Sequence, residues 1–241
     1  EKPMTGPGQL DQARDMIKAA KDAQRRLMVA YRLRYEPFNT KCVEILRSGQ
    51  LGKIRAIEAH NLQVTNAPNI RLSKSTGGGP LGDVGIYCLQ AIRYLSGEEP
   101  VDVSAMQHQP TDDPRFAEVP EGVTWLTRFP SGVLATCSCG FGSQESRAFT
   151  VSCSNGTLEL MNAFGYRGQE LYVTKGKERS RVQVAPVDHF KAEMDAYSRA
   201  ILEDKPHQTP GEEGLRDMYI MDKINEAIAS GGRVKIGELP A

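Results

Sequence analysis

The feature that most constrains the fold is a run of seven strand-like segments between residues 101 and 187. They read VDVSAMQH, VTWLTRF, GVLATCSCGF, AFTVSCS, TLELM, ELYVT and RVQVAPV. Two tight turns join neighbours within the run, Pro130-Ser131-Gly132 and Asn155-Gly156, and Asn-Gly is a strong hairpin signal. Strands joined this closely must be antiparallel, because parallel neighbours need a long crossover. The run therefore predicts a large, mostly antiparallel sheet.

Segments with helical periodicity lie on both sides of this run. Residues 9–26 predict a helix, LMVAYRL from Leu27 predicts a short buried strand, and a second helix begins at Pro37 and ends at Gly49. A strand is expected at 53–64 and a helix at 84–95. Two more apolar stripes follow the run, and RVKI near the end predicts a returning strand. The stripes are Phe190, Met194, Tyr197, Ile201 and Leu202, then Leu215, Met218, Tyr219, Met221 and Ile224. This order predicts an α+β fold with helices packed on one face of the sheet.

The second face of the sheet is expected to stay open, because the helices are few for so many strands. In VTWLTRF the alternation separates Val123, Trp125, Thr127 and Phe129 from Thr124, Leu126 and Arg128. The second set is too apolar for simple solvation and too polar for a core, which is typical of a subunit interface. We therefore expect a homodimer or a tetramer formed through the open sheet face.

Composition excludes several classes of partner. The 30 Lys and Arg residues balance the 30 Asp and Glu residues, so overall charge favours neither nucleic acid nor an anionic membrane. No apolar run reaches the roughly 18 residues of a membrane span. Five scattered cysteines fit a reducing compartment, and no signal peptide is visible, so we expect a cytoplasmic protein, or a periplasmic one if an export signal lies upstream. The four histidines lack ligand spacing, and no metal site is expected.

The stretch GGGPLGDVGIYCLQAIRYLSG, residues 77–97, holds the best candidates for chemistry. Asp83 and Tyr87 are four residues apart at the start of the predicted helix, so they lie along one side of it. From the residues alone, two interpretations stay open. Asp83 could cap the helix, a contribution of about 1 kcal/mol, while Tyr87 packs in the core. Alternatively, both could face a pocket, with the glycines letting the backbone approach a ligand closely.

Three segments, taken in order, resemble the glucose–fructose oxidoreductase / inositol dehydrogenase / rhizopine-catabolism (Gfo/Idh/MocA) family. They are Glu1-Lys2-Pro3, the run from Tyr31 to Pro37, and the stretch 77–97. The end of the chain, from Phe190 and Glu193 to Gly214, is similar as well. Tyr87 stands where the family's histidine is usual, and G-E-E-P follows the helix, which resembles the glucose–fructose oxidoreductase branch.

Members of this family carry a nucleotide-binding Rossmann domain before E-K-P, and that region is not part of this sequence. The resemblance therefore implies the C-terminal part of such a protein. Residues 1–35 would be the remnant of the nucleotide-binding domain, its last helix and strand. Residues 36–241 would form the α+β domain for substrate binding and oligomerisation.

The activity that the resemblance implies is hydride transfer between a sugar or polyol hydroxyl carbon and NADP or NAD. Tyr87 would remove the hydroxyl proton. A free tyrosine has a pKa of about 10, too high for this task, and a nearby ammonium lowers the pKa of a phenol. Lys2 would supply that ammonium and also contact the substrate or the nicotinamide ribose, and Asp83 would bind a sugar hydroxyl or orient Tyr87. Tyr35 would lie against the nicotinamide, and Arg71 would contact substrate.

The cofactor is not expected to bind this chain alone. No glycine-rich dinucleotide loop follows a strand in the sequence, so we expect the isolated chain to be inactive. The alternative function is a non-catalytic module that uses its sheet for assembly or binds a sugar.

Overall fold

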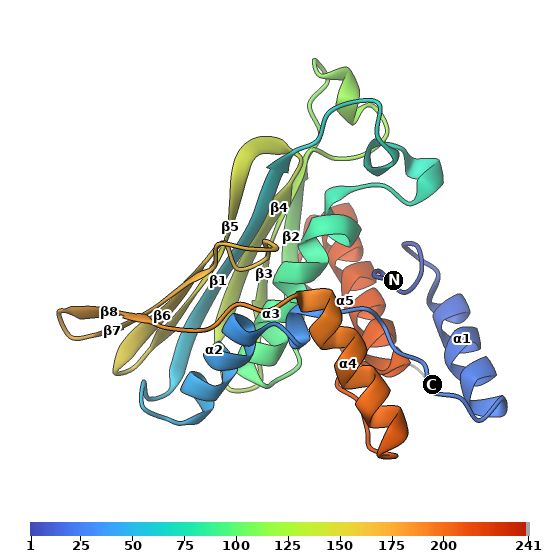
Figure 1. Cartoon of the computed structure of the whole chain (residues 1–241). Coiled ribbons are helices and arrows are strands. Elements are labelled where there is room, and N and C mark those ends of the chain that lie inside the picture. Colours follow the sequence, from blue (N-terminus) through green and yellow to red (C-terminus); the bar gives the residue numbers. More distant parts are fainter. Residues whose placement is uncertain (240–241) are drawn as a thin grey trace.

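A computed structural model describes residues 1–239, which are built around one nine-stranded sheet (Figure 1). The strands lie in the order β8-β7-β6-β5-β1-β4-β3-β2-β9. Their bounds are β1 Ile54–Val64, β2 Asp102–His108, β3 Gly122–Arg128, β4 Leu134–Gly140, β5 Gly142–Cys153, β6 Gly156–Met161, β7 Glu170–Lys175, β8 Glu178–Val182 and β9 Val234–Lys235. All neighbouring pairs are antiparallel except β1 and β4, so the predicted sheet is confirmed.

The two hairpins lie where the turn residues indicated. Trp125 of β3 faces Cys137 of β4, and Cys153 of β5 faces Gly156 of β6. The last strand of the run is displaced from its expected position at 181–187. The turn after Lys175 pairs that residue with Glu178, which starts β8 earlier, and β8 ends at Val182.

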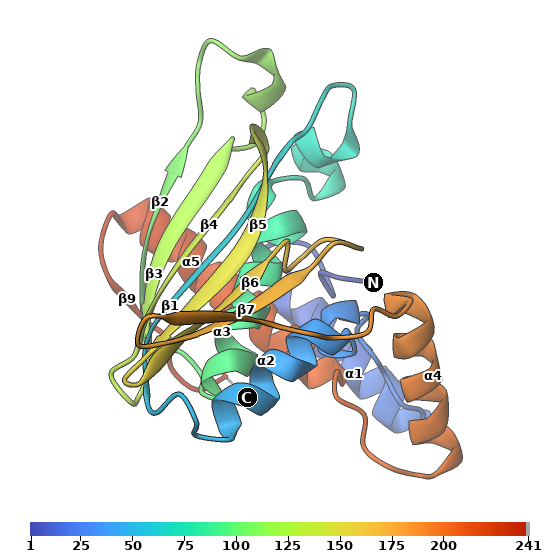
Figure 2. The ribbon, with the colours of Figure 1, turned by 60° about the vertical axis from the view of Figure 1, so that its left-hand side comes forward.

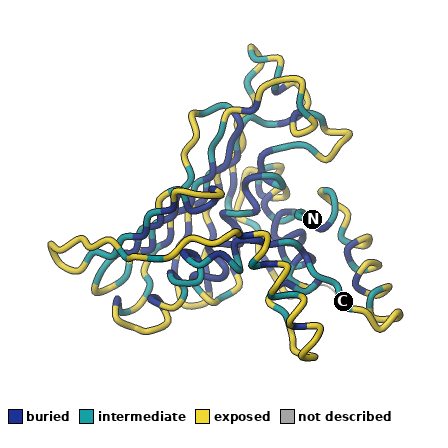
Figure 3. Tube along the Cα trace, viewed as in Figure 1, coloured by how far each residue is buried: buried dark blue, intermediate teal, exposed yellow. Residues whose placement is uncertain are grey.

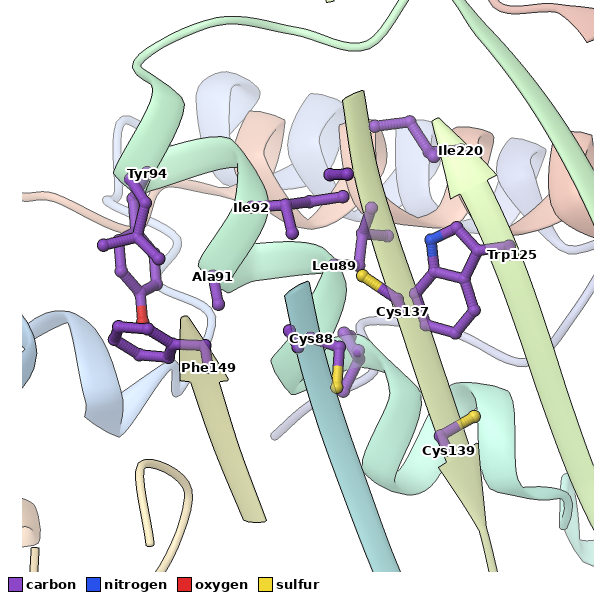
Figure 4. Packing of buried hydrophobic residues seen from close by; sticks show 14 of the residues in the cluster. Cys88, Leu89, Ala91, Ile92, Tyr94, Trp125, Cys137, Cys139, Phe149 and Ile220 are labelled. Carbon is purple, nitrogen blue, oxygen red and sulfur yellow. The ribbon is translucent and has the colours of Figure 1, made fainter. Parts of the chain in front are cut away.

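Within residues 1–239, five α-helices lie on one side of the sheet in two layers (Figures 1 and 2). Their bounds are α1 Leu10–Asp22, α2 Pro37–Arg47, α3 Ile86–Ser96, α4 His189–Leu202 and α5 Gly211–Ser230. In the inner layer α2, α3 and α5 pack on the strands, while α1 lies on α5 and α4 packs against the turn Arg32–Arg34. Figure 4 shows Leu89 of α3 next to Cys137 and Trp125 of the sheet, and all three are buried. The prediction of helices on one face is confirmed.

The expected strand from Leu27 is wrong. Only Met28 forms a bridge, to Pro210, and a 3₁₀ turn follows at Arg32–Arg34. A strand needs a neighbour along its length, and within residues 1–239 the backbone of this segment pairs only with the short stretch before α5. Its apolar side chains are nevertheless used, because Val29 and Tyr31 are buried in the core.

The apolar stripe of α4 does not face the core. Phe190, Met194, Ile201 and Leu202 are exposed, with Leu202 at 84%. Tyr197 is the member that packs inward, and its hydroxyl donates to the carbonyl of Arg26 at 2.9 Å. The helix is where the periodicity predicted it, but most of its stripe is left uncovered.

The outer face of the sheet is open, as expected (Figure 3). Val123, Trp125 and Thr127 point inward and are buried, whereas Leu126 and Leu134 point outward and are exposed. Met106 and Met161, also on the outer face, are exposed too. No helix within residues 1–239 has the length and apolar character needed to cross a bilayer.

Candidate active site

A cavity of about 380 Å³ lies beside the beginning of α3. Its walls come from the N-terminal segment, β1, the loop before α3, the loop after β6 and the start of α4. It is lined by the four residues that the sequence analysis assigned to catalysis or substrate binding: Lys2, Arg71, Asp83 and Tyr87. The fold therefore brings together the residues expected to act in catalysis and in substrate binding.

Asp83 does not cap the helix. It lies in a π-helical turn, Leu81–Gly85, that runs into α3, and neither element has a side-chain cap at its N-terminus. The carboxylate instead accepts a hydrogen bond from Arg71 Nε at 2.6 Å and lies 3.3 Å from Lys2 Nζ. Lys2 also donates to the backbone carbonyl of Asp83. Single π-turns inside helices occur often at functional sites, because they push a side chain out of the regular helical register.

The glycine loop before this turn positions Arg71. A Cβ on Gly78 would lie 2.5 Å from the carbonyl oxygen of Arg71, so only glycine fits there. Gly79 N–H donates to that same oxygen at 2.9 Å. The glycines thus fold the loop onto the backbone of Arg71, which directs this guanidinium toward Asp83.

Tyr87 both packs and faces the cavity. Its half-buried ring stacks on Phe164, with centroids 6.0 Å apart. Two cations lie near the ring: Lys2 Nζ at 4.5 Å and the Arg32 guanidinium carbon at 5.4 Å from the centroid. The hydroxyl makes no hydrogen bond within residues 1–239, which leaves it available to a ligand. Both cations therefore contact the ring of Tyr87, as in a cation–π interaction.

Asn61 of β1 is a site residue that the sequence interpretation missed. It is 2% exposed, and its amide donates to the carbonyl of Val84 in the π-turn at 3.1 Å. Its Oδ1 has no hydrogen-bond partner among residues 1–239. The sequence pattern could have identified Asn61, because it follows Ile57 and Ala59 on the inward side of an alternating strand. An apolar residue is expected at such a position.

Arg32 is a second missed residue. It is 4% exposed and donates to the carbonyl of Phe164 at 2.7 Å and to Nδ1 of His189 at 2.8 Å. In the described part of the chain its Nε has no hydrogen-bond partner. Burial lowers the pKa of His189, as does the arginine, although the Glu36 carboxylate opposes both. The neutral imidazole can therefore accept from the guanidinium through Nδ1.

Glu193 of α4 is the third missed residue. It is 5% exposed, it lines the cavity, and its Oε1 finds no hydrogen-bond partner in residues 1–239. Burial, with the Glu1 carboxylate nearby, raises the pKa of Glu193 to about 6. Arg32 and Glu193 lie in segments that carried the family resemblance, but nothing in the sequence pattern directs them toward one cavity.

Tyr35 is not part of this group. Its hydroxyl lies 3.1 Å from Thr209 Oγ1, outside the cavity of Lys2 and Tyr87. Its role toward nicotinamide stays a prediction that the observed geometry does not support. Among the described residues no three His, Cys, Asp or Glu side chains are placed to hold a metal ion.

The sequence of this chain is similar to those of several dehydrogenases. The D-xylose 1-dehydrogenase (NADP(+)) 2 of Haloferax volcanii is 26% identical over 242 aligned residues, which cover 98% of this chain and 72% of the relative. A trans-1,2-dihydrobenzene-1,2-diol dehydrogenase of Macaca fuscata fuscata is 29% identical, over 63% of this chain and 44% of its own length.

The structural comparison agrees over nearly the whole chain. The crystal structure of an aldose-aldose oxidoreductase from Caulobacter crescentus, complexed with glycerol, superposes with a TM-score of 0.92 at 33% identity. The match covers 98% of this chain and 70% of that protein. The family model of the GFO/IDH/MocA C-terminal domain matches residues 40–159, which run from α2 into β6 and include Asp83 and Tyr87. The chain therefore belongs to the GFO/IDH/MocA family.

Proposed function

We propose that this chain is the substrate-binding and catalytic part of an oxidoreductase that uses NADP or NAD and acts on a hydroxyl of a sugar or polyol. The observation that carries the proposal is that Lys2, Arg71, Asp83 and Tyr87 line one cavity. Lys2 lies over the Tyr87 ring and pairs with Asp83, which also binds Arg71. The printed names of the relatives above, a xylose dehydrogenase and an aldose oxidoreductase, support the substrate class.

The residues of this chain fit only the reacting end of a dinucleotide. Lys2, beside Tyr87, can donate to a ribose or substrate hydroxyl, and the orphaned Oδ1 of Asn61 is a further acceptor in the same cavity. The glycine loop is folded onto Arg71 and Ser73, so it is not shaped to cradle phosphates. We assign phosphate binding to a nucleotide-binding domain preceding Glu1, with residues 1–35 as its last part.

When bound, the nicotinamide supplies the hydride acceptor. Tyr87 accepts the proton of the sugar hydroxyl at its phenol oxygen. The Lys2 ammonium stabilises the negative charge of the phenolate, since it lies at the ring. Asp83 holds Lys2 and Arg71 in place, and its oxygens have lone pairs left to accept from a neighbouring sugar hydroxyl.

The test is Tyr87→Phe in the complete protein, with its nucleotide-binding domain. Turnover of a pentose or hexose should fall about 100-fold, the usual scale for loss of a general base, and cofactor affinity should stay unchanged. Tyr172→Phe is the matched control, because that hydroxyl bonds to Glu170 on β7, far from the cavity. If the Tyr87 variant kept its turnover, the ring would only pack and Tyr87 would not be the base. A complete wild-type protein that turned over no sugar or polyol would favour the non-catalytic sugar-binding module.

We also propose that the open sheet face pairs two copies of the chain. The outward side chains Leu126 and Leu134 lie on neighbouring central strands and are partly exposed beside polar residues, a mixture typical of interfaces. Light scattering of the purified chain should give about twice the 26.5 kDa mass, or more. Leu134→Glu should shift the protein toward the monomer, whereas Leu202→Glu on exposed α4 should not. A wild-type monomer at high concentration would contradict this assembly.

A further inference from the structure

Two large aromatic side chains at the rim of the cavity are stacked on one another and exposed. Tyr166, in the loop after β6, and Phe190, at the start of α4, have ring centroids 5.9 Å apart at an angle of 28°. They are 60% and 49% exposed, and both line the cavity of Tyr87. We call this pair the aromatic platform. Exposed aromatic surface that borders a cavity is typical of a binding site.

The platform lies close to the proposed catalytic base. The Arg32 guanidinium carbon is 4.2 Å from the centroid of the Tyr166 ring and 5.4 Å from that of Tyr87. The rings of Tyr87 and Tyr166 therefore both lie close to the Arg32 guanidinium, and the distance between their centroids cannot exceed the sum of these two distances. A ligand group on the platform would be next to the reacting group.

Hydrogen-bonding groups accompany the platform. Glu193 is three residues after Phe190 on α4, so the two share a face of the helix. Its Oε1 is buried without a partner, as is Nε of Arg32. A sugar ring matches such a setting, because its C–H face packs on aromatic rings while its hydroxyls donate to carboxylates and accept from guanidinium groups.

We place the ring that is oxidised at Tyr87, beside Lys2 and Asp83, and the ring that stacks on the platform next to it. We propose that the aromatic platform is a second sugar subsite, and that the cavity accepts a disaccharide or glycoside whose first ring reacts at Tyr87. This inference rests on the proposed function, because it takes the wall of Asp83 and Tyr87 as the place of the reacting ring.

Sugar binding to the 241-residue chain tests the subsite directly. Titrations with glucose, maltose and cellobiose, followed by ligand-observed NMR, should show at least one disaccharide binding about 10-fold more tightly than glucose. Tyr166→Ala and Phe190→Ala should remove that advantage and leave the glucose affinity unchanged. Met194→Ala is the matched control, because Met194 is 62% exposed on the next turn of α4 and does not line the cavity.

Other outcomes overturn the inference. Disaccharides that bind no more tightly than glucose, or alanine variants that weaken all sugars equally, would remove the second subsite but leave the proposed function standing. Tyr166→Ala raising the NADP(H) Kd of the complete protein, with sugar affinities unchanged, would assign the platform to the cofactor. Asp83→Asn separates the two proposals. If this change leaves glucose affinity unchanged, the proposed reaction site fails. If Tyr166→Ala still removes the tighter binding of the disaccharide, the second subsite stands. Absence of all sugar binding would overturn both.

Discussion

The two ends of α3 carry similar charged groups in opposite settings. At its beginning, Lys2 and Arg71 pair with Asp83 beside the cavity. At its other end, Arg93 pairs with Asp217 of α5 at 2.7 Å and with Glu99 at 2.6 Å, and Asp217 is fully buried. We call these the cavity cluster and the buried cluster.

In the buried cluster the charged groups neutralise one another. Both oxygens of Asp217 accept hydrogen bonds, one from Arg93 and the other from Gln90. Burial alone would lower the pKa of Arg93, but Asp217, Glu99 and Glu213 raise it overall, so the guanidinium stays charged. The cluster joins α3 to α5 and fixes the helix that carries Tyr87.

The cavity cluster differs in what it leaves unsatisfied. Around it lie Asn61 Oδ1 and Glu193 Oε1, two buried atoms without a hydrogen-bond partner among residues 1–239. Buried polar groups normally find partners, so such orphaned atoms at a cavity indicate a place for a ligand. Charge density alone therefore does not identify the site, whereas unsatisfied hydrogen-bonding capacity beside a cavity does.

The largest expected effect is on stability, from breaking the buried cluster. Arg93→Met leaves the fully buried Asp217 carboxylate without its cation, and we expect the free energy of unfolding to fall by about 3–5 kcal/mol. Lys2→Met, which leaves Asp83 paired with Arg71, should cost only about 1 kcal/mol. Urea denaturation of both variants measures the difference.

A double variant controls for simple loss of packing. Arg93→Met with Asp217→Leu replaces the ion pair by apolar side chains and should recover most of the stability lost in the single variant. If Arg93→Met and Lys2→Met lowered the free energy of unfolding equally, the proposed difference between the two clusters would be wrong.

Lys2→Met, which should cost little stability, should have a large effect on activity. In the complete protein we expect Lys2→Met to lower turnover about 100-fold, because the ammonium that stabilises the phenolate of Tyr87 is gone. The melting temperature should hardly change. Single-turnover kinetics at saturating cofactor separate this effect from weaker binding, and an unchanged rate would place Lys2 in a purely structural role.

Local patterns in the sequence were sufficient for the sheet. Alternation in VTWLTRF and a two-residue Asn-Gly turn depend on neighbouring residues, and they predicted the inward side of Trp125 and the β5–β6 hairpin. The segment at Leu27 has the same local character but forms only one bridge, at Met28. Whether an apolar segment becomes a strand depends on a neighbour, which periodicity does not specify.

The candidate site was predictable where spacing alone places side chains. Asp83 and Tyr87 share a side because they are four residues apart, and Asn61 could have been found as a polar residue in an inward register. Arg32 and Tyr35 show the limit. They lie three residues apart in one family-like segment, yet Arg32 lines the cavity and Tyr35 bonds to Thr209. A sequence motif identifies the segment, but the 3₁₀ turn at Arg32–Arg34 decides which side chain faces the cavity.

The smallest expected effect is a pH dependence of stability that comes from Glu193. Burial raises the pKas of both Asp217 and Glu193, but only Asp217 has a cation bonded to it. The groups acting on Glu193 are the Glu1 carboxylate, which adds to the rise, and Arg32 and the N-terminal amine, which oppose it.

Because the pKa of Glu193 is raised in the folded protein, stability should fall as pH rises. The folded protein holds the Glu193 proton up to about pH 6, whereas the unfolded chain releases it near pH 4.5, so this stabilisation is full below pH 4.5 and is lost as pH rises through 6. Because water in the cavity screens the charge, we expect a loss of only about 1 kcal/mol across this window. Glu193→Gln stays neutral and should remove that loss, so urea denaturation should show the variant gaining on the wild type as pH rises. Glu203→Gln, at the exposed end of the same helix, should follow the wild type throughout. Parallel curves for Glu193→Gln and wild type would mean that this carboxyl is satisfied in solution, and Glu193 would then belong with the buried cluster rather than with the site.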